Sequence, residues 1–136
     1  MSCKSNIYAV NTTSAAVVAN GTLPLSTIVR RYGCAANLSG NSVSLSESGY
    51  YLVNISATFT APAAGVVSIA LQDDGVAVTG ATASTTITTA STEVRTLNLT
   101  AIVRVFCNSA PDALTIVNTG VAATFSNIAI DVVKIA

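Results

Sequence analysis

The segment Ser48–Phe59, SGYYLVNISATF, alternates apolar and polar side chains with a period of two residues. From Tyr51 onward every second residue is apolar, which is typical of a strand that packs one face against a core. Segments of this kind recur at short intervals along the chain, and helix signals are almost absent. Such a chain can bury its apolar residues only by stacking strands, so the sequence predicts an all-β sandwich or barrel.

The candidate strands cover most of the chain, and several turns between them are explicit. SGN at 39–41 and DDG at 73–75 supply residues that adopt positive φ in tight hairpins. We predict strands at 5–10, 15–18, 26–32, 36–38, 42–45, 50–60, 66–72, 76–79, 83–89, 93–107, 113–118, 122–125 and 128–135. No linker or charge block interrupts them, so residues 1–136 are expected to form one domain.

Composition limits the classes of partner. Charged residues make up 9% of the chain and the net charge is zero, whereas charged residues usually make up about 25%. A chain without net charge has no electrostatic field that would attract nucleic acid or an anionic membrane, so neither is expected as a partner. A surface so poor in charge suits a protein that is covered in part by other subunits.

The N-terminal segment MSCKSNIYAV has no apolar stretch behind a basic start. We therefore expect no secretory signal peptide, and predict a chain that is intracellular or leaves the cell by another route, for instance within an assembled particle.

The chain contains few of the side chains that carry out catalysis. The chain contains no histidine, which excludes Ser-His-Asp and Cys-His catalytic groups and histidine metal sites. Cys3, Cys34 and Cys107 have no zinc-ligand spacing. We predict that Cys34 and Cys107 are small buried residues in strands, with a disulfide as the alternative. The chain is expected to have no catalytic residue, no metal and no cofactor, and not to be an enzyme.

The acidic residues leave two alternatives open. A pair of carboxylates could hydrolyse glycosides, but the acids Glu47, Asp73, Asp74 and Asp112 lie in turn contexts, where acids are common for structural reasons. Asp73 and Asp74 could also bind calcium. We favour an ordinary Asp-Gly hairpin at that position.

Several strands carry a second apolar patch on the face that points away from the core. Tyr50 and Leu52 oppose the core face of the opening segment, and Ile102 and Phe106 do so in EVRTLNLTAIVRVFC. Such patches usually mark a contact surface, and one loop could hardly cover several strands, although burial within one chain is the alternative. We predict an interface between identical subunits that contains Tyr8, Tyr50, Leu52, Ile102, Arg104, Phe106, Ile128, Ile130 and Val132.

Arg104 would enter this interface if it projects from the same face as Ile102 and Phe106. An arginine there would need a carboxylate or carbonyl groups from a neighbouring subunit. Asp131 is the candidate partner, and a solvated arginine at a sheet edge is the alternative.

Residues 48–78, SGYYLVNISATFTAPAAGVVSIALQDDGVAV, resemble the centre of the tumour-necrosis-factor and complement globular-head superfamily. In that superfamily an aromatic Gly-x-Tyr strand precedes a short turn, a Val-x-Ile-x-Leu strand and an Asp/Asn-Gly hairpin. Gly49, Tyr51, Leu71 and Gly75 match this pattern, and ATFSNIAIDVVKI resembles the closing strand. More narrowly, VRRYGC, NLSGNSVSL, GYY and IVRVFC are similar to small stand-alone members from gut Firmicutes and their prophages.

The resemblance implies a ten-stranded jelly-roll β-sandwich that forms a homotrimer, with the aromatic strand near the threefold axis. It implies a structural or adhesive role, as a virion decoration or fibre-head protein of a phage or prophage, with capsid or virion proteins or a host-surface glycan as partners. The chain would then stay in the bacterial cytoplasm until assembly and afterwards be in the virion or on a surface. The alternative is a carbohydrate-binding or cell- or spore-surface attachment module. Receptor-contacting loops and a Gly-x-y stalk are missing, so signalling and collagen-like assembly are not implied.

Overall fold

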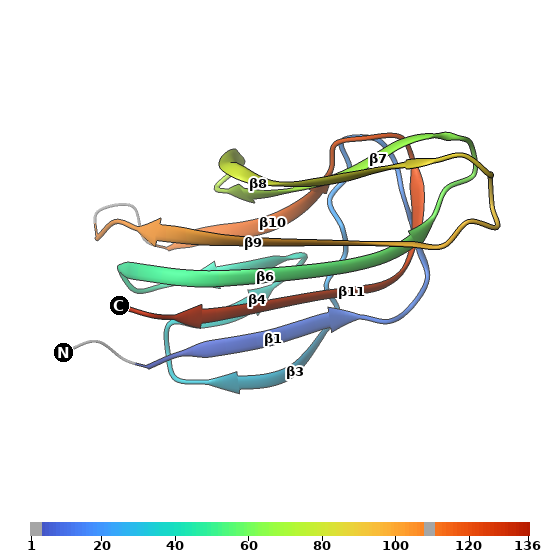
Figure 1. The fold of residues 1–136 in the computed structure, drawn as a ribbon. Coiled ribbons are helices and arrows are strands. Elements are labelled where there is room, and N and C mark those ends of the chain that lie inside the picture. Colours follow the sequence, from blue (N-terminus) through green and yellow to red (C-terminus); the bar gives the residue numbers. More distant parts are fainter. Residues whose placement is uncertain (1–3, 108–110) are drawn as a thin grey trace.

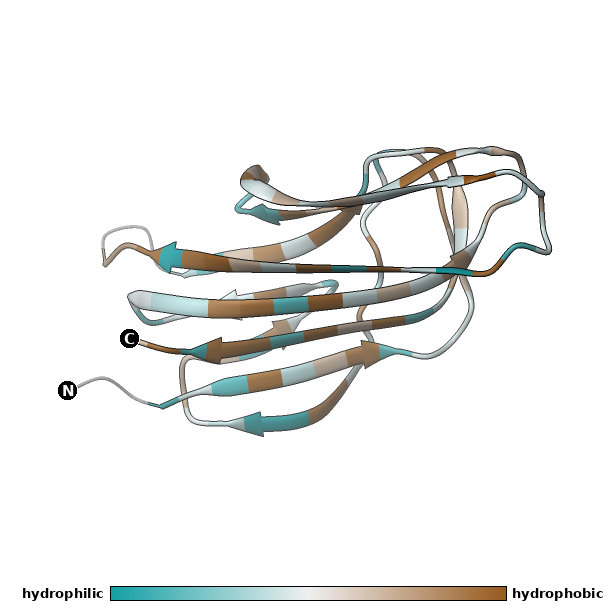
Figure 2. Cartoon of the chain, in the orientation of Figure 1, coloured by the Kyte–Doolittle hydropathy of each residue, from teal (hydrophilic) through white to brown (hydrophobic). Residues whose placement is uncertain are grey.

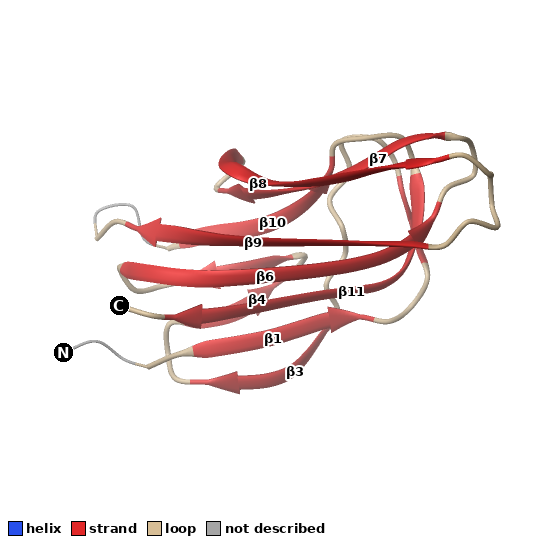
Figure 3. Ribbon diagram, viewed as in Figure 1, coloured by secondary structure: helices blue, strands red, loops and turns tan. Residues whose placement is uncertain are grey.

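A computed structural model describes residues 4–107 and 111–136, and this part of the chain consists of strands and connecting loops (Figure 3). The strands are β1 Asn6–Asn11, β2 Ala15–Val17, β3 Thr27–Tyr32, β4 Ala36–Ser39, β5 Ser42–Leu45, β6 Gly49–Thr60, β7 Gly65–Asp73, β8 Val76–Ile87, β9 Arg95–Val105, β10 Asp112–Asn118 and β11 Ala123–Lys134. Most predicted strands are confirmed. Predicted strands 76–79 and 83–89 form the single strand β8, and 122–125 and 128–135 form the single strand β11.

The strands form two antiparallel sheets that stack as a sandwich (Figure 1). We call them sheet A, with the order β3-β1-β11-β6-β9 and β2 paired to β11, and sheet B, with the order β4-β5-β10-β7-β8. Neighbours in each sheet are mostly distant in sequence, as in the pairing of β11 with both β1 and β6. The predicted β-sandwich is therefore confirmed, and its long crossovers give it the topology of a jelly roll.

The core lies between the two sheets and is built from the alternating apolar positions (Figure 2). Tyr51, Phe59 and Phe125 are among its largest fully buried side chains, and the rings of Phe59 and Phe125 lie 5.4 Å apart between centroids. The hydroxyl of Tyr51 donates to the carbonyl oxygen of Glu47 at 2.7 Å, and burial, aided by the Glu47 charge, raises the pKa of Tyr51 to about 12. The face of each strand that meets the other sheet is thus fixed by the apolar alternation.

The hairpin between β7 and β8 has the predicted Asp-Gly turn. Asp74 and Gly75 both adopt positive φ, at 51° and 83°, as the two central residues of a type I′ turn require. The structural interpretation of this Asp-Gly pair is therefore confirmed, and calcium binding here stays a separate hypothesis.

The predicted burial of the two cysteines is wrong. Cys34 and Cys107 are both exposed, because the first lies in the turn after β3 and the second lies beyond the end of β9. The Cys34 thiol donates to Oε2 of Glu47 at 3.1 Å. The predicted strand 93–107 runs two residues past the end of β9, and Cys34 falls between the predicted strands 26–32 and 36–38, so neither cysteine is on a strand that faces the core. Cys3 lies outside the described residues.

The described chain offers no helix of the length and apolarity needed to cross a membrane.

Candidate subunit interface

The outward face of sheet A, which points away from sheet B, carries most of the residues predicted for an interface. The strand register places them in cross-strand rows, because directly paired residues of antiparallel strands project to the same side. Tyr50 on β6 pairs with Arg104 on β9, and Leu52 pairs with Ile102 on β9 and with Val133 on β11. Residues far apart in sequence are thus brought into one surface at the end of the sheet where β6 begins and β9 ends (Figure 1).

We call this surface the apolar end and define it as Tyr50, Leu52, Ile102, Phe106 and Val133. Ile102 is 59% exposed, Phe106 50% and Tyr50 42%. Leu52 and Val133 are half-buried, and Leu52 lies between Val133 and Ile102 in the same cross-strand row. Exposed single apolar residues are ordinary, but contiguous aromatic and branched side chains on one sheet face are typical of a contact surface.

Arg104 lies within the apolar end and is held by its aromatic rings. Its guanidinium carbon is 4.3 Å from the centroid of the Phe106 ring and 5.5 Å from that of the Tyr50 ring. Both distances are within the range of cation–π attraction. A hollow of ≈ 440 Å³ lies beside this group and is also lined by Ser48, Gly49, Val105 and Cys107. The arginine is therefore placed against apolar surface with its charge facing outward.

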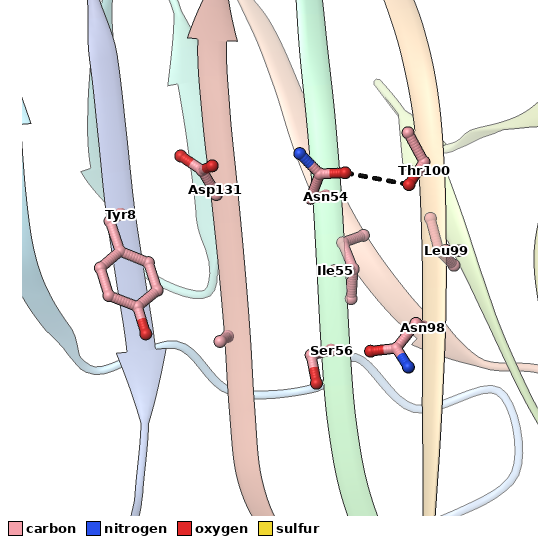
Figure 4. A pocket seen from close by; sticks show the side chains of 9 residues that line it. Tyr8, Asn54, Ile55, Ser56, Asn98, Leu99, Thr100 and Asp131 are labelled. Carbon is pink, nitrogen blue, oxygen red and sulfur yellow. Dashed lines mark hydrogen bonds between the residues drawn. The ribbon is translucent and has the colours of Figure 1, made fainter.

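The middle of the same sheet face is polar and forms a second, shallow hollow (Figure 4). We call it the polar hollow. Its volume is ≈ 320 Å³, and its lining residues are Tyr8, Asn54, Ile55, Ser56, Asn98, Leu99, Thr100, Ala129 and Asp131. The hydroxyl of Thr100 donates to Oδ1 of Asn54 at 2.9 Å. Ala129 of β11, which pairs with Val10 of β1 and Ser56 of β6, contributes only a methyl group to the lining.

Three residues predicted for the interface are wrongly assigned. Ile128, Ile130 and Val132 are 0% exposed and lie in the core between the sheets. They pair with Ala57, Ile55 and Val53, which also belong to the core. Both faces of the segment NIAIDVVKIA are apolar, so alternation alone could not decide which face points outward. The outward face of β11 is formed by Ala129, Asp131 and Val133, of which sequence reasoning named Asp131 alone, as the candidate partner of Arg104.

The other six predicted residues, Tyr8, Tyr50, Leu52, Ile102, Arg104 and Phe106, do lie outside the core. Tyr8 is separated from the apolar end and lines the polar hollow. That another subunit covers any of them stays a prediction.

A cluster of three carboxylates lies at one end of sheet B. Asp73, Asp74 and Asp112 each place an oxygen within 4.8 Å of the others. Burial, followed by hydrogen bonding to Asp112 and its charge, raises the pKa of Asp73 to about 7. Oδ1 of Asp74 accepts from the backbone N–H of Ala113 at 2.8 Å, which ties the hairpin to β10. The sequence indicated two of these acids but not the approach of Asp112, which depends on the sheet order.

Comparison with known proteins establishes the fold. No protein-family model and no curated protein matches the chain. Solved structures do match, including the Eiger TNF from S. frugiperda, with a TM-score of 0.75 and 14% identity over 99% of this chain and 94% of that one. The globular domain of zebrafish complement 1qA gives a TM-score of 0.71 with 6% identity, covering 96% and 97% of the two chains. The PRD1 vertex protein P5 gives 0.61 with 15% identity over 100% of both. The chain thus has a TNF-like jelly-roll fold, as the resemblance implied.

Proposed function

We propose that this chain is a non-enzymatic structural or adhesive module that works as a homotrimer, with the apolar end of sheet A as the centre of the subunit interface. We propose further that it serves as a decoration or fibre-head protein of a phage or prophage virion. The single observation that carries the proposal is the gathering of three substantially exposed apolar side chains: Tyr50 and Ile102 on the outward face of sheet A, and Phe106, just beyond β9, packed against Arg104 of the same face.

The physical reason lies in the cost of leaving this surface in water. Full burial of an apolar side chain contributes about 1.5–3 kcal/mol relative to full exposure, and these side chains are already about half covered, so a neighbour that covers the rest adds about half of that for each. Tyr50 and Ile102 lie on strands, and Phe106 directly follows β9. Because such a surface lies on a chain with zero net charge, little electrostatic repulsion opposes association. A closed ring of identical subunits buries the surface without leaving a free copy of it at either end.

The solved structures with this fold support the proposal by the kind of protein they include. One is described as a vertex protein, which is a structural role, and the others are described as a TNF and a complement globular domain. The virion assignment also rests on the resemblance of VRRYGC, NLSGNSVSL, GYY and IVRVFC to small proteins of prophages. Location in the bacterial cytoplasm before assembly follows from the same proposal.

A second candidate function, carbohydrate binding in surface attachment, is favoured by the polar hollow. Amides, a carboxylate and an aromatic ring are the groups that bind sugar hydroxyls and the apolar face of a sugar ring. Asn54, Asn98, Asp131 and Tyr8 supply them around one depression (Figure 4). The two functions compete for sheet A, because a subunit that covers the whole face would also cover the hollow.

A matched pair of variants tests the proposed interface. Ile102→Asp places a charge in the apolar end, and Val66→Asp places the same charge at a residue of similar exposure, 49%, on β7 of sheet B. The molar mass of each in solution is measured by light scattering after gel filtration. We expect the first variant to fall to the 13.7 kDa of one chain and the second to keep the mass of a trimer. An unchanged mass in both, or an equal loss in both, would place the interface elsewhere.

The carbohydrate alternative has its own measurement. Binding of the wild-type chain and of Asn98→Ala to an array of glycans would reveal a sugar ligand of the polar hollow. Binding that disappears in the variant, by a chain that is a monomer, would put attachment in place of assembly.

A further inference from the structure

We infer that Arg104 of one subunit forms an ion pair with Asp131 of the next subunit across the interface. The inference rests on the proposed trimer and deepens it, since it names the charged contact that fixes how neighbouring subunits meet.

Arg104 is placed to bind an anion that the described residues of its own chain do not supply. Its guanidinium is stacked on Phe106 and lies near the Tyr50 ring, yet it makes no hydrogen bond or ion pair with any other residue of the described chain. A guanidinium offers five N–H donors in a planar fork that matches a carboxylate. Stacking limits the orientations of this fork, so less conformational entropy is lost when an anion binds.

Asp131 is the complementary group on the same face of the sheet. It projects outward from β11 and lines the polar hollow beside Tyr8 and Asn54 (Figure 4). It is half-buried, and among residues 4–107 and 111–136 no group forms a hydrogen bond or a salt bridge with its carboxylate. A partly desolvated carboxylate without a partner is costly to cover unless the covering surface brings a cation.

The two residues cannot pair within one chain. The register places Arg104 opposite Tyr50 on β6, whereas Asp131 is opposite Asn54 of the same strand. Asp131 also lies on β11, on the far side of β6 from β9. The separation is therefore about 14 Å along the strands and about 10 Å across them, far beyond the distance of an ion pair.

A cyclic trimer can bring them together, because its interfaces join two different patches of the same surface. The exposed Arg104, packed on the rings of Tyr50 and Phe106, lies at the apolar end, and the polar hollow around Asp131 is a depression on the same sheet face. Arg104 and Asp131 belong to different cross-strand rows, so they can meet only if the strands are inclined to the threefold axis. The inclination brings Arg104 of one subunit to the same position along the axis as Asp131 of the next. The twist of a sheet inclines its strands in this way.

Arg30 is the rival cation and provides the control. It pairs with Tyr8 on the edge strand β3, in the same row as Asp131. Its guanidinium donates to the carbonyl oxygen of Val29 at 3.2 Å. A subunit arrangement with strands parallel to the axis would favour Arg30 over Arg104 as the partner of Asp131.

The test is a charge exchange, measured as the trimer dissociation constant by sedimentation equilibrium. Arg104→Asp and Asp131→Arg are each expected to weaken the trimer at least about tenfold, because each leaves two like charges facing one another. The double variant with both changes is expected to regain most of the loss. Arg30→Asp with Asp131→Arg is expected to regain none of it. Far-UV circular dichroism on each variant reports whether the sandwich itself is kept.

The outcomes separate this inference from the trimer itself. A wild-type chain that is a monomer would overturn both. Two results with a wild-type trimer would overturn the Arg104–Asp131 pair and leave the trimer in place. In one, the single changes do not alter the dissociation constant; in the other, Arg30→Asp restores the affinity that Asp131→Arg removes and Arg104→Asp does not. Should a charge reversal unfold the chain, Arg104→Gln and Asp131→Asn replace it. Losses that add independently in their double variant would then contradict the pair.

Discussion

The strands of both sheets alternate inward and outward residues, but the outward faces of the two sheets carry different side chains. Along β7 and β8 of sheet B, the paired outward residues are Val66 with Thr86 and Ser68 with Ser84. Along β6 and β9 of sheet A, the pairs at one end are Tyr50 with Arg104 and Leu52 with Ile102. A solvated strand needs only polar residues on its outer face. Sheet B exposes Val66 beside polar neighbours, whereas Tyr50, Leu52 and Ile102 of sheet A are neighbours of one another, and the proposed contact surface rests on this clustering.

The largest expected effect separates the inward from the outward face of β11. Val132→Asp buries a charge at a residue with 0% exposure, which costs several kcal/mol and should prevent folding. Val133→Asp, one residue later on the outward face, should leave a folded chain with a lower molar mass. Circular dichroism and light scattering on both variants check this. A folded Val132→Asp would contradict the corrected facing of β11.

Thiol reactivity gives the next effect, through a comparison of two exposed cysteines. Cys107 lines the hollow beside Arg104 and Phe106, whereas Cys34 lies in the turn after β3. If the proposed trimer forms, Cys107 should react with a thiol reagent more slowly than Cys34. In the Ile102→Asp variant, Cys107 should lose this protection. Mass spectrometry of timed samples measures both rates, and equal rates in the wild-type chain would mean that the apolar end is open.

A pH effect is expected at the end of sheet B. The pKa of Asp73 is raised to about 7 in the fold from an ordinary value of 3.8, so folding favours the protonated form. The contribution of this carboxyl group to the stability of the fold is fully present below about pH 4 and is lost as the pH rises through 7.

Asp73→Asn should therefore remove part of the loss in stability between pH 5 and pH 8. We expect about 1 kcal/mol, below the full linkage value because solvent screens the partly exposed group. Urea unfolding at the two pH values measures it, and an Asp74→Asn variant is the control for a nearby carboxylate. A wild-type chain that is more stable at pH 8 than at pH 5 by this measure would contradict the assignment.

The smallest effect is expected in the loop between β8 and β9. Glu93 accepts from the backbone N–H groups of Thr88 and Thr89, both at 2.9 Å, and pairs with Arg95. The hydrogen bond from Thr89, then that from Arg95, lowers the pKa of Glu93 to about 2. These bonds are present above the ordinary pKa of a glutamate and are lost as the pH falls towards 2.

Glu93→Gln should speed hydrogen exchange at the amides of Thr88 and Thr89 while the molar mass stays unchanged. Nuclear magnetic resonance at neutral pH measures the exchange rates. Unchanged rates would mean that the loop does not depend on this carboxylate.

The sequence predicted the sandwich because period-two alternation and turn dipeptides are local signals. The facing of Tyr51, Val53 and Ile55 could be read directly, since their opposite face is polar at Asn54 and Ser56. The facing of β11 could not be read, because Ile130 and Val133 are both apolar and only the pairing with β6 decides between them.

The site was predicted in part, for a related reason. Leu52 and Ile102 each looked misplaced on its own strand, and that signal is local. The polar hollow and the approach of Asp112 to Asp73 depend on which strands become neighbours. Sheet order is a property of the whole chain that no single segment encodes.

Light scattering across a range of dilutions gives the molar mass of the unaltered chain in solution and so shows whether the chain forms a trimer. We predict three times the 13.7 kDa of one chain, falling only at high dilution. A mass of one chain at every concentration would contradict it, and would leave Tyr50, Ile102 and Phe106 open to a different ligand.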